Sequence, residues 1–358
     1  MSIIARYIFW KILRSSFAVL AGLLALFIFF DTLQEISSGE YMRTGTLIAM
    51  FNILLGIPER LYEIMPVSVM IGSMITFSNL SQFSEYAVLR CSGISVTRLM
   101  TVILAAGAVF AVLNVCIGEY LSPKSNSYRS DLKLQSSIDE LVAKNFKSGY
   151  WVKDKDSFVN VTLIENPRAL FGISIYVVDD SAQLVSKITA EQAIFIDQQG
   201  WQLQRAKLII FNDGNPHRTL HKSLPWDTAL TPETVKLLGV NRKQMSIGDL
   251  ATYVAYLKEN NQQYSMLESV LWSKLSHPLL VLILGLLGLL VARMEGRSMS
   301  LGFILFSGVM AGVAIYFLNK LFFSLGSIQG WSPAVYAFLP STMILLLFSS
   351  IIYVLERR

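Results

Sequence analysis

The sequence predicts a membrane α-helical protein with six transmembrane helices, three on either side of an inserted all-β domain with a jelly-roll-like fold. Three observations lead to this fold class. Of the 358 residues, 53% are hydrophobic and only 15% are charged, whereas a soluble domain carries about 25% charged residues. Long uncharged apolar runs lie toward both ends of the chain. The middle alternates in short strand-like runs. This composition excludes a wholly cytosolic enzyme.

The six predicted spans lie in gaps between charged residues, because a spanning helix needs about 20 mainly apolar residues. The gaps are residues 15–30, 64–84, 99–118, 275–292, 298–319 and 334–355. The last one is the end of a longer gap that Gly326, Gly330 and Pro333 interrupt. The first span has a basic start but no small-residue cleavage site after it, so we expect a retained anchor rather than a cleaved signal peptide.

Lysine and arginine are distributed unevenly among the short loops, and this predicts the orientation. Nine lie in segments that we place in the cytoplasm: Arg6, Lys11, Arg14, Arg90, Arg98, Arg293, Arg297, Arg357 and Arg358. The short outer segments contain only Arg43 and Arg60. Both termini are therefore expected in the cytoplasm. This asymmetry accounts for most of the net charge of +5, so no nucleic-acid partner is implied.

Three regions follow from this topology. Residues 1–121 hold transmembrane helices 1–3 with a cytoplasmic helix at about residues 81–97. Residues 122–270 form the β domain with flanking helices, on the outer side of the membrane. Residues 271–358 hold transmembrane helices 4–6.

Seven short runs in the middle region predict an antiparallel sandwich or jelly roll. They are residues 150–152, 158–164, 173–178, 184–188, 193–196, 201–211 and 217–224. The runs 173–178 and 201–211 are long and free of proline, so they are the candidate open edges for strand addition. Residues 127–141 and 246–258 are expected to be helical. Ser246 would cap the second helix, which has apolar positions at Leu250, Val254 and Leu257.

Motifs of common enzymes are absent from the sequence: there is no phosphate-binding loop, no Gly-x-Ser-x-Gly elbow and no His-Glu-x-x-His. His217 and His221 fall about 13 Å apart on one strand face, so a shared metal is not expected. We expect His277 at a helix end in polar surroundings. Cys91 and Cys116 are expected to be small buried apolar residues without a disulfide. A permease, anchor or receptor is more plausible than an enzyme.

Four stretches in a fixed order carry a family resemblance. They are Ala5-Arg6-Tyr7-Ile8, the loop Ser84-Glu85-Tyr86-Ala87-Val88-Leu89-Arg90-Cys91-Ser92-Gly93, the segment Ile117-Gly118-Glu119-Tyr120-Leu121-Ser122-Pro123, and Trp272-Ser273-Lys274-Leu275. Together with the arrangement of spans they resemble the lipopolysaccharide export permeases of the LptF/LptG (YjgP/YjgQ) family, the G-type members in particular. No single stretch is highly specific, but the ordered set covers essentially the whole chain.

The resemblance implies the permease subunit of an ABC-type exporter in the bacterial inner membrane, which extracts lipopolysaccharide and passes it to a periplasmic bridge for outer-membrane biogenesis. The implied partners are a homologous LptF-type permease, a cytoplasmic LptB-type ATPase dimer and LptC/LptA-type bridge proteins. ATP and magnesium would be used by the ATPase, and this chain would bind no cofactor. In the family, one permease of the pair makes the bridge contact more directly than the other.

Two sets of residues are candidates for this role. The loop of residues 81–97 is amphipathic, and the resemblance assigns ATPase coupling to Glu85, Tyr86 and Arg90. At the outer rim, five cations could meet the phosphates of lipopolysaccharide: Lys124, Arg129, Lys133, Lys274 and Lys320. The outer half of the first span has no basic residue and ends in Asp31 and Glu35, unlike a helix that contacts phosphate.

Two other functions stay open at this point. The chain could transmit a signal from a cytoplasmic ATPase to a periplasmic partner without moving lipid. It could also be a structural anchor without an ATPase partner. Lipid crosslinking in the membrane cavity separates the first from a permease, and capture of an ATPase through the Glu85 loop dismisses the second.

Overall fold

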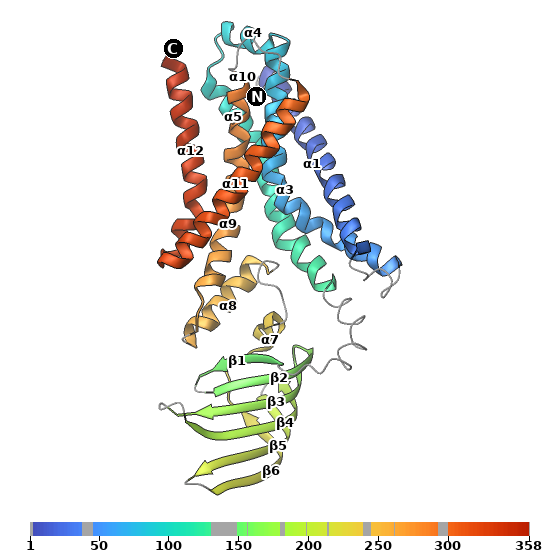
Figure 1. The fold of residues 1–358 in the computed structure, drawn as a ribbon, viewed down its shortest axis with the longest axis vertical. Coiled ribbons are helices and arrows are strands. Elements are labelled where there is room, and N and C mark those ends of the chain that lie inside the picture. Colours follow the sequence, from blue (N-terminus) through green and yellow to red (C-terminus); the bar gives the residue numbers. More distant parts are fainter. Residues whose placement is uncertain are drawn as a thin grey trace. The chain divides into compact units, whose positions relative to one another are not determined.

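The computed structural model describes residues 3–37, 46–129, 149–155, 157–179, 183–197, 199–212, 215–238, 245–260, 262–292 and 300–357. The chain divides into two compact units, which are described separately. The helical unit comprises Met1–Arg129 and Glu268–Arg358, and the β unit comprises Ser130–Leu267 (Figure 1). The predicted helix at 127–141 falls largely outside the described residues.

Six helices in the described part of the chain are long and apolar enough to cross a membrane, which confirms the predicted number. They are built from α1 (Ile3–Ser37), α3 (Thr46–Gln82), α5 (Val96–Cys116), α9 (Ser265–Leu286) with α10 (Gly288–Ala292), α11 (Leu301–Gln329) and α12 (Pro333–Arg357). The helices extend beyond the apolar runs that predicted them. A charged residue ends an apolar run but does not end a helix, because lysine, arginine and glutamate are good helix formers.

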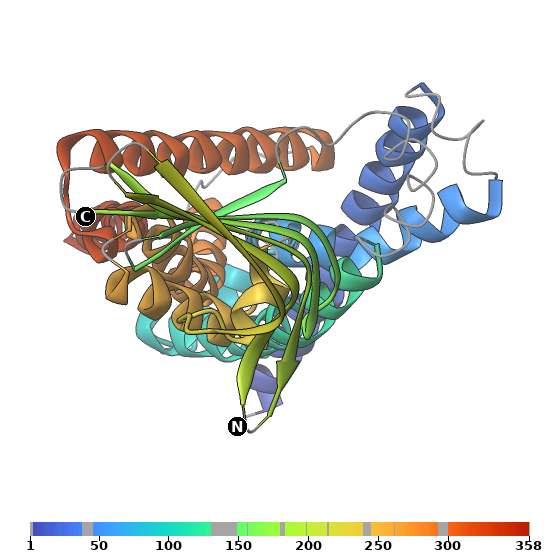
Figure 2. The ribbon, with the colours of Figure 1, turned by 90° about the horizontal axis from the view of Figure 1, so that it is seen from below.

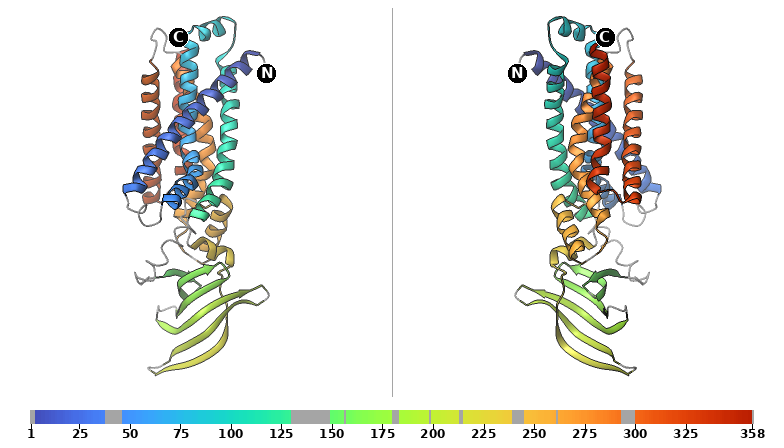
Figure 3. Two further views of the ribbon diagram at one scale, coloured as in Figure 1. Left: turned by 90° about the vertical axis from the view of Figure 1, so that its right-hand side faces the viewer. Right: turned by 90° about the vertical axis from the view of Figure 1, so that its left-hand side faces the viewer.

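The long helices run side by side within the helical unit, and the short helix α4 (Glu85–Cys91) lies at one end of them (Figure 1). Figure 3 shows from two sides that α1 begins, and α12 ends, toward this same end.

Helix α3 lies at the centre of the helical unit. Of its apolar stretch 72% is buried, compared with 22% for α1 and 17% for α11. Small residues let α1 and α10 approach it closely. A Cβ added at Gly72 of α3 would lie 2.5 Å from the Cα of Ser16 of α1, and one at Gly288 of α10 would lie 2.4 Å from Ser73 Oγ. Such contacts between small residues are typical of helices packed in membranes.

The described residues of the β unit form one antiparallel sheet of six strands in the order β1-β2-β3-β4-β5-β6. The strands are β1 (Tyr150–Asp154), β2 (Ser157–Asn166), β3 (Ala169–Val178), β4 (Leu184–Ile196), β5 (Gly200–Asn212) and β6 (Asn215–Trp226). Figure 2 shows from below how strongly these strands bend together. The all-β prediction is confirmed. The described strands form a meander and lack the crossing connections of a Greek key, because each strand pairs with the next one along the chain.

Two sequence predictions about the strands are wrong. The separate runs 184–188 and 193–196 form the single strand β4, because the residues between them remain extended and paired: Thr189 and Ala190 face β3, and Gln192 faces both β3 and β5. The runs 173–178 and 201–211 are not edges. They belong to β3 and β5, and each of these strands pairs on both sides.

The two edges of the sheet are β1 and β6. Both show features that protect open edges in natural proteins, namely shortness and proline. Strand β1 has only five residues. Strand β6 contains Pro216 and Pro225, and proline is tolerated at an edge because it donates no hydrogen bond to a neighbouring strand. The absence of proline from β3 and β5, from which we predicted open edges, is instead what interior strands require.

The described part of the β unit also contains two helices, α7 (Pro232–Leu238) and α8 (Ile247–Glu259). The predicted helix 246–258 is confirmed, including its cap. Ser246 and Asp249 form a reciprocal capping box, and Leu250, Val254 and Leu257 are buried. A buried hydrogen bond joins strand β5 to the segment before α7: Trp201 Nε1 donates to the Leu230 carbonyl at 2.7 Å.

Candidate functional site

Helix α4 contains the predicted coupling residues and packs by one side only. It begins after Ser84, which has a left-handed backbone conformation with φ of 59° and turns the chain sharply away from α3. The Tyr86 side chain is buried in the same hydrophobic cluster as Val96 and Leu99. Val88 is 63% exposed on the helix surface. The outer side of α4 is therefore open to a partner.

The Glu85 carboxylate is held by the first turns of α1. Tyr7 Oη donates a hydrogen bond of 3.0 Å to Glu85 Oε2, and Lys11 Nζ lies 3.5 Å from the same oxygen. Lys11 also donates to Tyr7 Oη at 3.0 Å, so the three groups form a closed triangle. About a third of the Glu85 side chain remains exposed, so it is partly accessible to a partner.

The other two predicted coupling residues have different environments. Tyr86 is only 7% exposed, and its hydroxyl is buried without a hydrogen-bond partner in the described part of the chain. Its role in this geometry is to anchor α4 in the helical unit. Arg90 donates from Nη1 to the Ile94 carbonyl at 3.1 Å and so closes the turn after α4. Glu85 is the one carboxylate in the sequence of α4.

Four of the five predicted phosphate-binding cations fall within the described residues, and Lys133 lies outside them. Lys124 and Lys320 are exposed. The Arg129 guanidinium lies beside Gly56 of α3, where an added Cβ would be 3.4 Å from Nη1. Its Nε atom is buried and makes no hydrogen bond with a described residue.

Lys274 is enclosed in the helical unit. It lies inside α9, which begins at Ser265, and its Nζ is 3.7 Å from Glu119 Oε1. The two side chains are only 10% and 19% exposed. A charged pair at such low exposure is costly to desolvate and marks a functional candidate in a membrane segment. A phosphate reaching Lys274 would have to compete with Glu119.

A second set of polar contacts lies one helical turn further along α9. His277, one helical turn after Lys274, donates from Nδ1 to Asn114 Oδ1 at 3.0 Å, because an amide oxygen can only accept. Asn114 Nδ2 in turn donates to the Tyr62 carbonyl at 3.0 Å. The Tyr62 and His277 rings stack with centroids 4.3 Å apart. Three long helices, α3, α5 and α9, are thereby joined.

The carboxylate of this cluster lies on a π-helical turn, η1 (Ile117–Leu121). Such turns insert a residue into a helix and occur often at functional sites. Gly118 within the turn is required by close packing, since a Cβ there would lie 2.6 Å from two atoms of the Tyr62 ring. The stretch Gly118-Glu119 therefore fits the tyrosine and the lysine at the same time.

Sequence reasoning missed this cluster, although two of its members lie in stretches that carried the resemblance. His277 was expected at a helix end, and this is wrong: it lies within α9 and is hydrogen-bonded to Asn114. Burial of Cys91 and Cys116 was also wrong, as both are exposed. Cys116 lies on a face of α5 that the described residues leave exposed, as expected of a surface that meets lipid.

The far end of α1 has its own ion pair. Arg60 of α3 donates to both oxygens of Asp31, from Nε at 3.0 Å and from Nη2 at 2.9 Å, and it also reaches Glu63 at 3.2 Å. The acidic end of α1 is thus matched by a cation from α3. This bidentate contact is the strong form of an arginine-carboxylate pair.

The described residues contain no group of three or more histidine, cysteine, aspartate or glutamate side chains that could hold a metal ion. His221 contacts Thr219, with Nε2 and Oγ1 3.3 Å apart. The arrangement as a whole offers polar contacts between helices and an accessible carboxylate on α4.

Comparison with known proteins covers almost the entire chain. Residues 6–357 match the family model for the lipopolysaccharide export system permease LptF/LptG. The chain is 26% identical over 346 residues to the lipopolysaccharide export system permease protein LptG of Escherichia coli (strain K12), across 96% of this chain and 95% of that protein. It is also 26% identical to the protein of the same name in Haemophilus influenzae, across 96% of each chain.

Proposed function

Because the chain belongs to the LptF/LptG family of lipopolysaccharide export permeases, we propose that it is the permease subunit of an ABC-type exporter. In this role it extracts lipopolysaccharide from the inner membrane and passes it to a periplasmic bridge. The observation that carries the proposal is the match over residues 6–357, which includes both groups of spans and the β unit between them.

Coupling to an ATPase is assigned to α4. The helix lies at the end of the helical unit where α1 begins, it exposes Val88, and its first residue is Glu85 with a partly accessible carboxylate. A cytoplasmic LptB-type ATPase dimer would supply a cation or N–H donor for Glu85 and an apolar groove for the exposed face. ATP and magnesium belong to that partner, and this chain needs no cofactor.

The topology that this role requires places α4 and both termini in the cytoplasm and the β unit in the periplasm, in agreement with the distribution of lysine and arginine. Labelling of single cysteines tests it. A cysteine at Asn212 should react with an impermeant reagent from the periplasm, and one at Gly296 should not. Labelling of both from one side refutes the six-span topology.

A homologous LptF-type permease is the partner within the membrane. Helices α1 and α11 are poorly covered by their own chain, with 22% and 17% of their apolar stretches buried. A second permease would cover part of these surfaces and leave a cavity for the acyl chains of lipopolysaccharide between the subunits. The β unit would join LptC/LptA-type bridge proteins by adding strands at β1 or β6.

Contact with the phosphates of lipopolysaccharide is assigned to the rim cations Lys124, Arg129, Lys133, Lys274 and Lys320. Exposure favours Lys124 and Lys320, and the partly buried Arg129 is the best placed for a lasting contact beside α3. Lys274 would contribute only if its ion pair with Glu119 opens.

Photocrosslinking tests these assignments. With a photoreactive residue at Tyr128, which is 66% exposed, lipopolysaccharide should be captured by the protein. Combined charge reversal of Arg129 and Lys133 should lower the yield more than either single change. Arg98→Glu, near the opposite end of the same continuous helix, is the matched control and should leave the yield unchanged. Equal yields in all variants assign the cations to simple anchoring at the interface.

A transmitter that couples an ATPase to a periplasmic partner without moving lipid remains the second candidate. Purification of the chain with its associated partners, followed by mass analysis of proteins and bound lipid, separates the two. A complex with ATPase and bridge proteins but no lipopolysaccharide favours the transmitter.

A further inference from the structure

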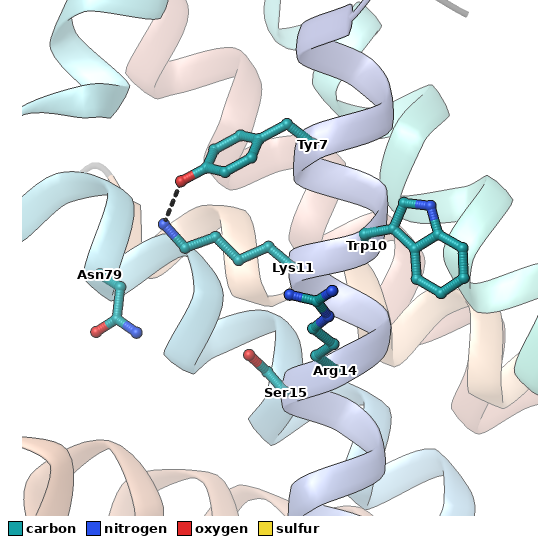
Figure 4. Close-up of a pocket in the computed structure, with 6 residues that line it drawn as sticks. All are labelled: Tyr7, Trp10, Lys11, Arg14, Ser15 and Asn79. Carbon is teal, nitrogen blue, oxygen red and sulfur yellow. Dashed lines mark hydrogen bonds between the residues drawn. The ribbon is translucent and has the colours of Figure 1, made fainter.

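A cavity of about 620 Å³ opens beside the first turns of α1. Five of the six residues that line it come from α1, and the sixth comes from α3: Tyr7, Trp10, Lys11, Arg14, Ser15 and Asn79 (Figure 4). Figure 4 shows Tyr7 and Lys11 pointing from α1 toward the side where Asn79 lies, with Arg14 below Lys11 on the same helix. The cavity therefore lies against the α1–α3 packing and is open outward.

The lining is cationic. Lys11 and Arg14 contribute positive charge, and none of the six lining residues is acidic. The nearest carboxylate, Glu85, takes one of the three N–H groups of Lys11, and Tyr7 takes a second. Among the described residues, no third acceptor meets Lys11, so one of its N–H groups is left for a ligand. Two cations against one carboxylate leave a single positive charge at the cavity.

The remaining polar groups are unengaged. Arg14 is exposed, and neither its guanidinium nor the Asn79 amide makes a hydrogen bond or ion pair within the described part of the chain. An arginine fork, a lysine ammonium and an amide are suited to the oxygens of one phosphate group. The cavity volume lies in the range of pockets that hold small ligands.

The position along α1 fits the headgroup layer of a membrane. Trp10 and Tyr7 are about half exposed at the cavity, and the helix continues from there into its apolar stretch. Tryptophan and tyrosine gather at this depth because their rings have both apolar and polar parts. Basic pockets between membrane helices on the cytoplasmic side are suited to anionic headgroups.

We propose that this cavity binds the phosphate headgroup of an anionic glycerophospholipid, with Arg14 and Lys11 on the phosphate and Trp10 beside the glycerol and upper acyl chains. The assignment to the cytoplasmic leaflet rests on the proposed function, whereas the binding chemistry does not. One bound phosphodiester would match the single excess positive charge. A lipid in this place would also lie next to the Lys11–Glu85 contact and so stabilise the start of α1 against α4.

Native mass spectrometry of the purified chain, titrated with phosphatidylglycerol or phosphatidylcholine, tests the proposal. One phosphatidylglycerol should be retained in preference to phosphatidylcholine. Arg14→Gln should weaken its retention about fivefold. The matched control is Arg6→Gln, which removes the same charge from the same helix but lies outside the cavity lining. Equal losses in both variants would reveal diffuse surface attraction and overturn a built site.

Position is checked with brominated phosphatidylglycerol in nanodiscs, where bromine quenches nearby tryptophan fluorescence, in a chain whose other membrane tryptophans, Trp272 and Trp331, are replaced by phenylalanine. The quenched component should disappear in Trp10→Phe and shrink in Arg14→Gln. A quenched component that persists in Trp10→Phe overturns the placement. Capture of a protein partner, rather than phospholipid, by a photoreactive residue at Trp10 would assign the cavity to a protein interface.

Lipopolysaccharide also carries phosphate, and a further experiment distinguishes its binding from that of phospholipid. Arg14→Gln should leave crosslinking of lipopolysaccharide at Tyr128 unchanged, because that site lies at the other end of the spans. Parallel loss of both would assign the cavity to the exported lipid and overturn the proposal. Failure of lipopolysaccharide crosslinking in the unmodified chain, with phosphatidylglycerol still retained, refutes the proposed function alone.

Discussion

Replacement of Lys274 by methionine removes one member of the enclosed ion pair and keeps the length of the side chain. Glu119 then remains in the helical unit, at 19% exposure and without the ammonium group 3.7 Å away. The variant therefore separates two roles for Lys274. It is either a partner that neutralises Glu119 or a rim cation that meets solvent and headgroups.

The expected cost follows from the geometry. Two unit charges about 4 Å apart attract by about 4 kcal/mol at an effective dielectric constant of ~20. Desolvation of both groups offsets much of this attraction, so the intact pair adds little net stability. Removing one partner is different, because the remaining charge stays enclosed after losing this contact, and the loss of one member of a buried pair costs about 3–5 kcal/mol. Lys274→Met and Glu119→Gln should both destabilise, and the double variant should recover most of the loss.

Heating of the purified variants in one detergent, followed by fluorescence-detected size-exclusion chromatography, measures the effect. Both single variants should lose their monodisperse peak at clearly lower temperature than the double variant. Lys320→Met is the matched control, because Lys320 is exposed on α11, and its stability should stay near that of the original chain. A double variant as unstable as the sum of the single ones would refute the pairing.

Three further predictions concern other parts of the molecule. Glu85→Lys should weaken binding of the ATPase by about 2–5 kcal/mol, measured by co-purification, whereas Tyr7→Phe, which keeps the carboxylate, should not; normal binding in Glu85→Lys would make α4 a simple linker. Leu220→Lys on the edge strand β6 should lower crosslinking to bridge proteins, and Leu163→Lys on the interior strand β2 should not; equal yields would move docking to β1 or to the partner permease. Burial, with the charge of Asp154 as a smaller cause, raises the pKa of Tyr256. The neutral form of Tyr256 stabilises the fold fully below about pH 10, and this stabilisation is lost as the pH rises further. The free energy of unfolding should therefore fall less steeply with rising pH in Tyr256→Phe.

The spans were predictable because they depend on a local property, the distance between charged residues along the chain. Their ends were not, since helix α9 begins at Ser265 and continues through Lys274. A charge can remain in a membrane helix when another helix supplies its partner. That partner, Glu119, lies far away in the sequence, and nothing in the local pattern around Lys274 indicates it.

The strands show the same division. Alternation predicted an all-β region and the capped helix α8, because both signals are local. The order of strands in the sheet is a non-local property, so alternation alone could not identify the edges. A usable signal was present: Pro216 and Pro225 exclude β6 from the sheet interior, and the absence of proline from β3 and β5 is what interior strands require.

The contacts of α1 connect the two ends of the helical unit. At one end Lys11 and Tyr7 bind Glu85, the first residue of α4. At the other end Arg60 of α3 binds Asp31. Between these two ends, α1 and α3 pack so closely at Gly72 that one helix cannot slide along the other without a steric clash. Rotation of α1 against α3 would break the ion pairs and lose the close packing together. A protein that binds α4 through Glu85 therefore acts on α1 as well, and α1, α3 and α4 are expected to move as one block. Helix α11 is less covered by the rest of the unit, with 17% of its apolar stretch buried. Movement of α11 relative to the other helices should therefore need the least free energy.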